Sequence, residues 1–306
     1  MIALQTKDQR DLMIEGAKKI LIVDDTHNIT QYENTRLLNV LVVDEHNFGW
    51  PVAHLISNSM TGSVIAYFAT ALKHVAKQAD SEFKINCLIT DDDPAIINGF
   101  ESGFASKIRH ILCQWHLDKT LQKNIREKSD PEMFQTIYDE IKIVIGTRNP
   151  DEFYHLYAAF LKKHENDSKA FVEYLKSHYS HRTEKWAMSS RVGIGHGNIN
   201  TTSHVESFHN KLKSKYLQRI PNKRMDHIIN VLLDIEKDDL GARKRLDMLG
   251  PAQPKAHLQH DRSLEIDDKA LSNISSSVWQ ITSNNSSTEE SKVYFIEQVN
   301  QVCCAI

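Results

Sequence analysis

The stretch KKILIVDDT, residues 18–26, decides the fold. It is a short, β-branched apolar run of the length of a buried strand, and it ends in two acids. Two more apolar runs follow, RLLNVLVVDEHN at 36–47 and FGWPVAHLISN at 48–58. The tight connection between them predicts that these two strands pair antiparallel. Pro51 predicts an edge position for the third strand, or a place at its start.

Helical and strand patterns alternate over the next seventy or so residues. Periodic apolar residues predict a helix at 63–77, capped by Thr61 or Ser63. A strand at 83–93 ends in acids, and Pro94 opens a helix at 94–106. A short strand at 107–116 then runs into a helix that ends near residue 128. This alternation predicts an α/β fold, a mixed sheet flanked by helices.

The pattern then changes to helices. Apolar residues at helical spacing fill 131–188, a Gly/Asn/Thr loop occupies 192–204, and helices are predicted at 205–217 and 224–247. Thr202 or Ser203 is the expected cap of the first of these two helices. Two final strands are expected in the segments 277–285 and 291–304.

Bulk properties narrow the class of protein. The 306 residues, 41% of them hydrophobic, can bury a substantial core, and the net charge of -3 does not by itself indicate a nucleic-acid binder. No window approaches the roughly 20 apolar residues of a membrane span, so no membrane partner is expected. The four cysteines lack regular spacing, which predicts reduced thiols in a cytosolic or nuclear protein.

Three acids stand where chain elements begin or end. Asp24 closes the first strand, Asp91 closes the fourth, and Glu206 opens a helix after the polar loop. Clustered carboxylates repel one another unless a cation lies between them, and Mg²⁺ prefers such oxygen ligands. The alternative for any one acid is that it caps a helix or faces solvent. For the neighbouring acids, Asp25, Asp92 and Asp93, that second reading or a supporting role is expected.

Four blocks resemble the Mutator-like (MULE) transposase family, in the family's order. They are VDDTHNITQYENTRLLNVLVVD (23–44), CLITDDDPAIINGF (87–100), RHILCQWHLDKTLQKNI (109–125) and NTTSHVESFHNKLK (200–213). The resemblance implies an RNase H-like mixed sheet with an all-helical insertion before the third acid. It places the family's catalytic, metal-binding acids on Asp24, Asp91 and Glu206.

The activity implied by the resemblance is metal-dependent DNA strand cleavage and transfer in cut-and-paste DNA transposition. The expected cofactor is Mg²⁺ or Mn²⁺. The expected partners are transposon ends, target DNA and further copies of the chain, because such enzymes act as homo-oligomers, and the expected location is the nucleus. Two alternatives remain: a domesticated, DNA-binding transcriptional regulator without catalysis, and an unrelated metal-dependent nuclease, against which the third and fourth blocks argue.

The expected domain organisation has five parts. Residues 1–17 lead into the core, 18–128 form its first part, 129–190 form the helical insertion, 191–250 carry the third acid and closing helices, and 251–306 are a linker and a hairpin. That hairpin resembles the one that leads into a SWIM zinc finger. Because Cys303 and Cys304 are adjacent and two residues follow them, a closed finger is not expected here. A truncated gene model, a decayed copy of an element or a partial sequence would each account for this end.

Cys113 and His116 have the C-x-x-H spacing of half a zinc site. The second half could come from His178, His181 or His196, but none has clear spacing. We favour a structural or supporting role beside the acids over zinc binding. Trp115 is expected in the core, and Trp186 is a candidate for stacking on a flipped base.

A basic stretch follows the third acid. Lys211, Lys213, Lys215 and Arg219 have no acid among them, which is typical of a surface that contacts DNA phosphates. The alternative is a solvated helix face. Further basic residues on the helix after His116 extend the candidate surface; they are Lys119, Lys123 and Arg126.

Overall fold

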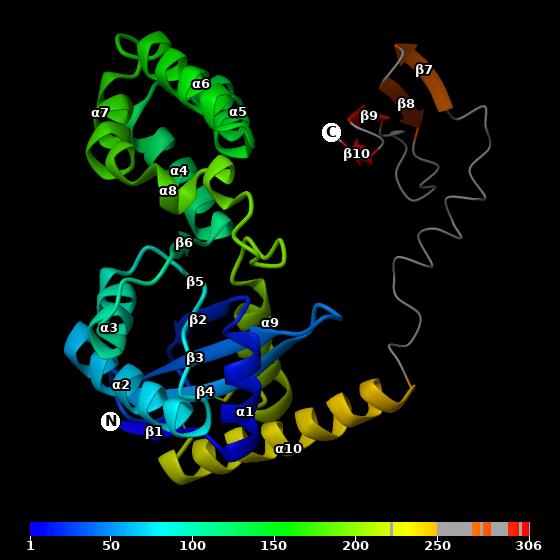
Figure 1. Cartoon of the computed structure of the whole chain (residues 1–306). Helices are drawn as coiled ribbons and strands as arrows, with labels where there is room; N and C mark the ends of the chain where they lie inside the picture. The colour runs from blue at the N-terminus through cyan, green and yellow to red at the C-terminus, as the bar shows by residue number, and fades with distance from the viewer. Residues whose placement is uncertain (221–222, 250–270, 276–277, 283–292, 300–301, 306) are drawn as a thin grey trace. The chain divides into compact units, whose positions relative to one another are not determined.

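Six strands form a mixed sheet, in the order β1-β4-β3-β2-β5-β6 (Figure 1). Their bounds are Ile2–Leu4 (β1), Leu21–Thr26 (β2), Arg36–Val43 (β3), Gly49–Ser57 (β4), Leu88–Thr90 (β5) and His110–Leu112 (β6). β2, β3 and β4 run antiparallel in turn, whereas β5 is parallel to both β2 and β6. The prediction of an α/β fold built on a mixed sheet is therefore confirmed.

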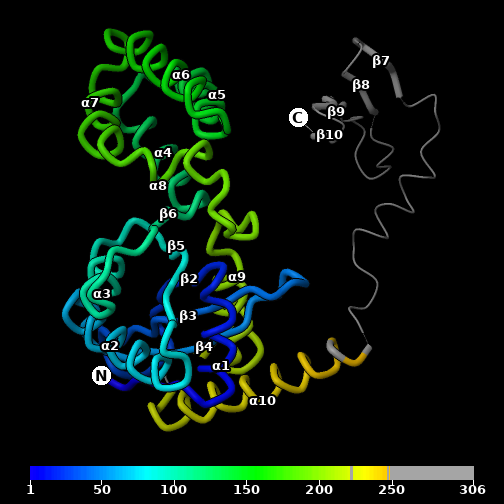
Figure 2. Tube along the Cα trace, in the orientation of Figure 1, coloured from blue at the N-terminus to red at the C-terminus, as the bar shows by residue number. Residues whose placement is uncertain are grey.

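The computed structural model describes residues 1–220, 223–249, 271–275, 278–282, 293–299 and 302–305, as the coloured and grey parts of Figure 1 show. Figure 2 traces the Cα path of the first part of the chain in the same orientation. The chain divides into two compact units, 1–240 and 241–306. The linker expected from residue 251 lies, up to residue 270, outside the described residues. None of the described helices is long and apolar enough to cross a membrane.

Residues 1–17 add a strand and a helix that the sequence pattern did not predict. β1 pairs antiparallel with β4, Ile2 opposite Ile56, and α1 (Lys7–Gly16) packs on β3 and β4. The Thr6 hydroxyl accepts from the Gln9 N–H (3.2 Å), and the Gln9 side chain accepts from the Thr6 N–H (3.0 Å). This capping box, T-x-x-Q, is the signal that could have predicted the helix.

β1 also corrects the expectation for Pro51. β4 lies between β1 and β3, so it is not an edge strand. Pro51 is the third residue of β4, opposite Leu41, where the register of the β3–β4 pair shifts. A proline lacks a backbone donor, and the start of a strand beside a bulge is a position where that donor is not missed. The alternative placement at the strand's start was therefore the correct one.

Helices cover both faces of the sheet. Leu41 and Val43 of β3 belong to the core cluster that includes α9 (Ser203–Lys211) and α10 (Met225–Leu249), with Phe208 and Leu232 among its members. Val42 points the other way, because a Cβ added to Gly16 of α1 would lie 2.4 Å from its side chain. Successive side chains of β3 point to opposite faces of the sheet, so α9 and α10 cover one face and α1 covers the other.

α2 (Gly62–Ala79) and α3 (Pro94–Phe104) pack against each other. The Thr61 side chain caps α2, as predicted, and the Asp93 carboxylate caps α3 by accepting from the Ala95 N–H at 2.8 Å. Capping by Asp93 was one of the roles expected for that acid.

Helices fill the chain between β6 and α9. They are α4 (Gln114–Lys128), α5 (Phe134–Gly146), α6 (Pro150–Lys163), α7 (Lys169–His178) and α8 (Thr183–Trp186). Their shared core centres on Trp186, whose ring lies 5.4 Å from that of Phe153 and 5.5 Å from that of Tyr157. Trp186 is 3% exposed and donates its indole N–H to the Tyr179 carbonyl. The suggestion that Trp186 stacks on a base is therefore wrong, because its ring is committed to this core.

The second unit contains an antiparallel sheet in the order β10-β9-β8-β7. The strands are Leu271–Ser275 (β7), Val278–Thr282 (β8), Val293–Val299 (β9) and Val302–Ala305 (β10). Two strands were predicted here; β7 was missed, and the segment 291–304 holds two strands that pair as a hairpin. The side chains of Cys303 and Cys304 lie outside what the structure describes, so the zinc-finger interpretation of this segment stays a prediction.

Candidate active site

Asp24 lies inside β2, and Asp91 directly follows the neighbouring strand β5. β2 and β5 are parallel, with Leu21 opposite Leu88 and Ile22 opposite Ile89, and continuing that register brings Asp24 level with Asp91. Asp24 is 8% exposed and Asp91 is half-buried. The parallel pairing therefore places the first two predicted acids side by side. The expectation that Asp24 closes its strand is wrong, because β2 continues to Thr26, whereas Asp91 directly follows β5 as predicted.

The two carboxylates share a strained electrostatic environment. Burial raises the pKa of Asp24 to about 7, and the nearby Asp91 charge adds to that rise while His116 opposes it. Burial likewise raises the pKa of Asp91, again against the effect of His116. Because both carboxylates are partly removed from water and lie near each other, their charged forms are destabilised. A positive charge beside them would stabilise those charged forms.

Glu206 reaches this region from the first turn of α9, which packs on β2. The Thr202 hydroxyl lies 3.5 Å from the Glu206 carboxylate and 3.3 Å from the Cys113 sulfur, and the Thr202 N–H donates to the same sulfur. Cys113 directly follows β6, so this chain of contacts ties Glu206 to the end of that strand. Thr202 occupies the N-cap position of α9, but its side chain bonds to Cys113 instead of capping.

The structure does not join the three acids into one ready set of ligands. In the part of the chain that it describes, no three His, Cys, Asp or Glu side chains lie close enough together to hold a metal ion. Asp24 and Asp91 form one close pair, and Glu206 is linked to Cys113. Ligation of one ion by all three acids therefore stays a prediction.

Cys113 and His116 lie beside the carboxylate pair. Burial acts to raise the pKa of the Cys113 thiol, but hydrogen bonds from His116 and Thr202 outweigh burial and lower it. Burial acts to lower the pKa of His116, yet the Cys113 contact and the charges of Asp24 and Asp91 raise it overall. The imidazole is thus biased towards its charged form, which fits the supporting role expected for it.

Two of the three histidines considered as further zinc ligands, His178 and His196, have other neighbours. His196 lies 3.3 Å from the Asn200 side chain, and His178 lies 2.8 Å from the Ser177 hydroxyl. Cys113 already accepts two hydrogen bonds from Thr202. These contacts favour the structural interpretation of Cys113 over zinc binding.

A cavity of about 410 Å³ opens beside Asp91, and Cys113, His116 and Tyr179 are among the residues that line it. Trp115, next to His116, was expected in the core, but it is 40% exposed. The Lys119 ammonium lies over the Trp115 ring, 3.4 Å from the ring centroid. The helix position explains this outcome, because α4 buries Leu117 and Leu121 and so turns Trp115 outward.

The acids next to the pair have protein partners of their own. Asp25 forms an ion pair with Arg36, and Asp92 is bound by both terminal nitrogens of Arg182 at 2.5 and 2.6 Å. Asp93 caps α3. These contacts agree with the expectation that Asp25, Asp92 and Asp93 have capping, solvated or supporting roles.

A buried network of polar side chains connects α9 to the sheet. The Asn39 side chain lies 2.8 Å from His209 Nε2 of α9 and 2.7 Å from His54 Nδ1 of β4. Burial lowers the pKa of His54 to about 4 and that of His209 to about 3, so both rings are neutral at pH 7. Asn39 pairs with Asp24 across the strands. The sequence analysis missed this network, although a lone Asn and a lone His inside apolar strand runs were a visible signal.

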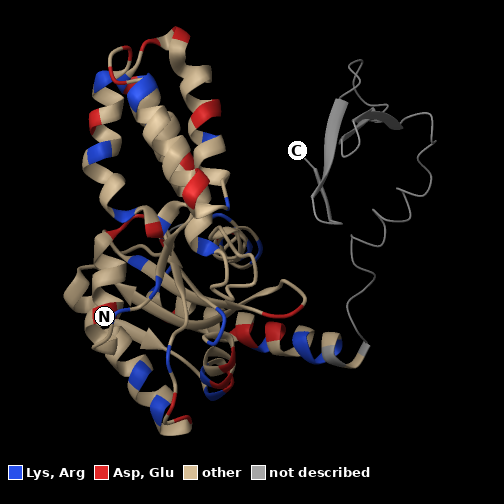
Figure 3. Cartoon of the chain, turned by 45° about the horizontal axis from the view of Figure 1, so that its top comes forward, with Lys and Arg blue, Asp and Glu red and all other residues tan. Residues whose placement is uncertain are grey.

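The basic stretch is less free than its sequence indicates. Lys211 forms an ion pair with Asp239 of α10, and Lys215 lies 4.0 Å from Asp238. Figure 3 shows acidic and basic residues close together along α10. Among the described residues, Lys213 and Arg219 have no acidic partner. Fewer than four of these basic side chains are therefore free to contact DNA phosphates. The acids that pair with the others come from α10, a helix further along the sequence.

Comparison with known proteins places a family on one segment of this chain. Residues 20–120 match the model of the MULE transposase domain, and this segment includes Asp24, Asp91, Cys113 and His116 but not Glu206. None of the curated proteins matches the chain. The resemblance seen in the sequence is thus confirmed over this segment: residues 20–120 are similar to the MULE transposase domain.

Proposed function

We propose that this chain is the catalytic domain of a DDE-type transposase, which cleaves DNA strands and transfers them in cut-and-paste transposition. The observation that carries the proposal is the level placement of two carboxylates inside the matched segment. Asp24 is buried in β2, and the half-buried Asp91 directly follows the parallel strand β5. Glu206, on the helix packed against β2, is the proposed third acid.

An RNase H-like fold is part of the proposal. It is supported by the way the antiparallel strands β2, β3 and β4 continue into the parallel strands β5 and β6. The helices from α4 to α8 come between β6 and α9, which agrees with a helical insertion before the third acid.

The donor set suits Mg²⁺ or Mn²⁺. The paired carboxylates offer hard oxygen ligands, and burial raises the pKa of each, with His116 opposing that rise. A divalent ion bound there supplies charge stabilisation to the attacking and leaving oxygens of phosphoryl transfer. His116 offsets part of the repulsion between the carboxylates, and Thr202 orients Glu206.

The proposal extends to DNA as partner, to a homo-oligomer as the active form and to the nucleus as location. These parts rest on the family resemblance. Lys213 and Arg219 support the DNA partner most directly, because no acid neutralises them among the described residues.

The test is nicking of supercoiled plasmid DNA with Mg²⁺ or Mn²⁺ by the wild-type chain, Asp91→Asn and Glu206→Gln. Losing a ligand removes several kcal/mol of transition-state stabilisation, so each variant should cleave about 100-fold more slowly or worse. Asp92→Asn is the matched control, since Asp92 is exposed and bound to Arg182, and it should cleave normally. Cleavage by both site variants at the wild-type rate would refute the site.

A further inference from the structure

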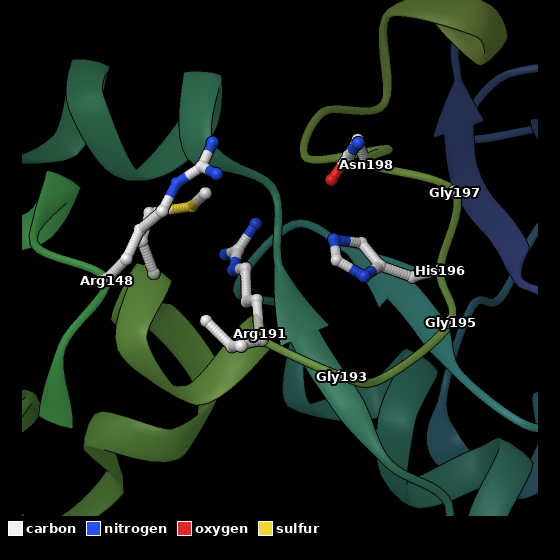
Figure 4. A pocket seen from close by; sticks show the side chains of 9 residues that line it. Arg148, Arg191, Gly193, Gly195, His196, Gly197 and Asn198 are labelled. Carbon is white, nitrogen blue, oxygen red and sulfur yellow. The ribbon is translucent and has the colours of Figure 1, made fainter. Parts of the chain in front are cut away.

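A second pocket, of about 280 Å³, lies under the glycine-rich loop at 192–198 (Figure 4). Gly193, Gly195 and Gly197 have φ of +77°, +72° and +65°, a conformation that side chains resist. A Cβ on Gly193 or Gly195 would meet nothing within 4 Å, so packing does not require glycine there. The glycines instead set the backbone in left-handed turns, and no described residue accepts a hydrogen bond from the N–H groups of these three glycines. Such exposed N–H groups form anion-binding concavities.

Arg191 forms the floor of this pocket without an acidic partner. Its side chain is 2% exposed and donates to the Leu112 carbonyl (2.6 Å) and to the Asn200 side chain (2.9 Å). Its Nε atom is buried and has no hydrogen-bond partner. Among the described residues no carboxylate pairs with this guanidinium, and burial lowers its pKa to about 10. A buried, unneutralised arginine is costly unless an anion completes its environment.

The rest of the lining adds positive charge and donors. Arg148, from the turn before α6, is exposed and has no acidic partner among the described residues. Figure 4 shows Arg148 and Arg191 on one side of the pocket and His196 and Asn198 on the other. No Asp or Glu lines the pocket. Two guanidinium groups that face a common space repel each other, and a bound anion removes that repulsion.

The pocket adjoins the proposed catalytic region. Leu112 ends β6, lines the cavity beside Asp91, and gives its carbonyl to Arg191. The Gln114 N–H donates to the Asn200 carbonyl, so the start of α4 is tied to the loop that follows the glycines. An anion bound in the pocket is thus linked, through Arg191 and the Leu112 carbonyl, to the cavity beside Asp91.

We propose that the pocket formed by Arg148, Arg191 and the glycine loop binds a backbone phosphate of DNA. The inference rests on the proposed function, because it assigns one contact of the same nucleic-acid substrate. Arginine suits this role, since its planar donors match two phosphate oxygens. The contact carries no base specificity and positions the strand relative to the acids.

The test is binding of a fluorescein-labelled DNA duplex of random sequence to the full chain, by anisotropy over a salt series. Arg148→Gln should weaken binding about three- to ten-fold and lower the slope of log K against log salt by about 0.9, because one phosphate contact is lost. Asn198→Asp puts an anion at the pocket rim with little backbone change and should weaken binding at least as much. Both positions avoid the buried Arg191, so neither change should affect folding.

Lys162→Gln is the matched control. It removes one positive charge from exposed α6 outside the pocket and should leave affinity and slope nearly unchanged. If Arg148→Gln and Asn198→Asp bind like this control, the pocket is not a phosphate site. If the wild-type chain binds no duplex at all, the inference fails as well.

The inference and the proposed function can fail separately. Loss of affinity in both pocket variants, from a wild-type chain that does not nick plasmid, supports the phosphate site and refutes the catalysis. Nicking that depends on Asp91, with affinity untouched by Arg148→Gln and Asn198→Asp, refutes the phosphate site and keeps the catalysis.

Discussion

Among single residues, Asp24 carries the largest cost of burial in the candidate site. The pairing of β2 with β5 brings its carboxylate next to that of Asp91, and burial takes it out of water. A stable protein tolerates such a residue when a function requires it. The free energy that the buried charge takes from folding can therefore be measured, and it indicates a functional site.

Asp24→Asn should stabilise the chain when metal is absent. The folded-state pKa, about 7, lies above the unfolded value, 3.8, so the cost of ionising Asp24 appears as pH rises from about 4 to 7 and is complete at pH 8. In EDTA at pH 8 we expect the free energy of unfolding to rise by about 1–3 kcal/mol. The gain should vanish below about pH 4, where Asp24 is protonated in both states.

Urea unfolding at the two pH values measures this difference. Asp167→Asn is the control, since Asp167 is exposed on a loop after α6 and should show no gain. With Mn²⁺ present the order should reverse, because only the wild-type chain keeps both carboxylates for the ion. A variant that is less stable than wild type at pH 8 in EDTA would contradict the electrostatic account.

At the scale of elements, the contact of α2 with α3 depends on glycine. A Cβ on Gly103 would lie 2.6 Å from both the Ala66 carbonyl oxygen and the Ala69 side chain. The same face of α3 presents Gly99 to Ile65 at 2.6 Å. The two helices can approach this closely only because two side chains are missing, and α3 begins directly after Asp91 and its acidic neighbours.

Gly103→Ala should therefore destabilise the chain, by about 1–3 kcal/mol, because backbone atoms cannot move aside as a flexible side chain can. Gly146→Ala, at the end of α5, has nothing within 4 Å of its added Cβ and should be neutral or stabilising by up to about 1 kcal/mol. Thermal unfolding of the two variants gives the comparison. Equal stability of the two would mean that the helices can separate without cost.

At the scale of the whole molecule, the core of the first unit is closed by its last helix. Ile228, Val231, Leu232 and Ile235 of α10 are buried in the cluster that also contains β2, β3 and α9. Glu236 of the same helix accepts a hydrogen bond from Thr6, near the other end of the unit. The first unit thus depends on contacts between residues more than 200 positions apart.

A chain that ends at residue 249 should keep the cooperative unfolding transition of the first unit, whereas one that ends at residue 224 should lose it. Each buried aliphatic side chain of α10 contributes about 1.5–3 kcal/mol, and four of them together match the whole stability of a typical domain. Circular dichroism during heating distinguishes the two chains. A sharp transition in the shorter chain would show that α10 is dispensable to the core.

Much of this protein could be predicted from local pattern. Apolar spacing located β2, β3, β4 and most helices, since each buries one face or stripe. Asp93 and Pro94 marked the start of α3, and the first two family blocks lie within the segment that the MULE transposase domain matches, whereas the fourth lies outside it. The position of Asp91 directly after a strand was also visible in the sequence, whereas the strand of Asp24 runs two residues further than its pattern predicted.

The sequence by itself determined most strands and helices, the α/β class and the resemblance, because these depend on residues close together in the chain. Only the tertiary structure decided which surfaces meet. It turned Trp115 outward and Trp186 inward, and it paired Lys211 with an acid 28 positions away. It also set Arg191 beneath the glycine loop without an acid. Burial and charge pairing depend on elements that are distant in sequence, so no local pattern could predict them.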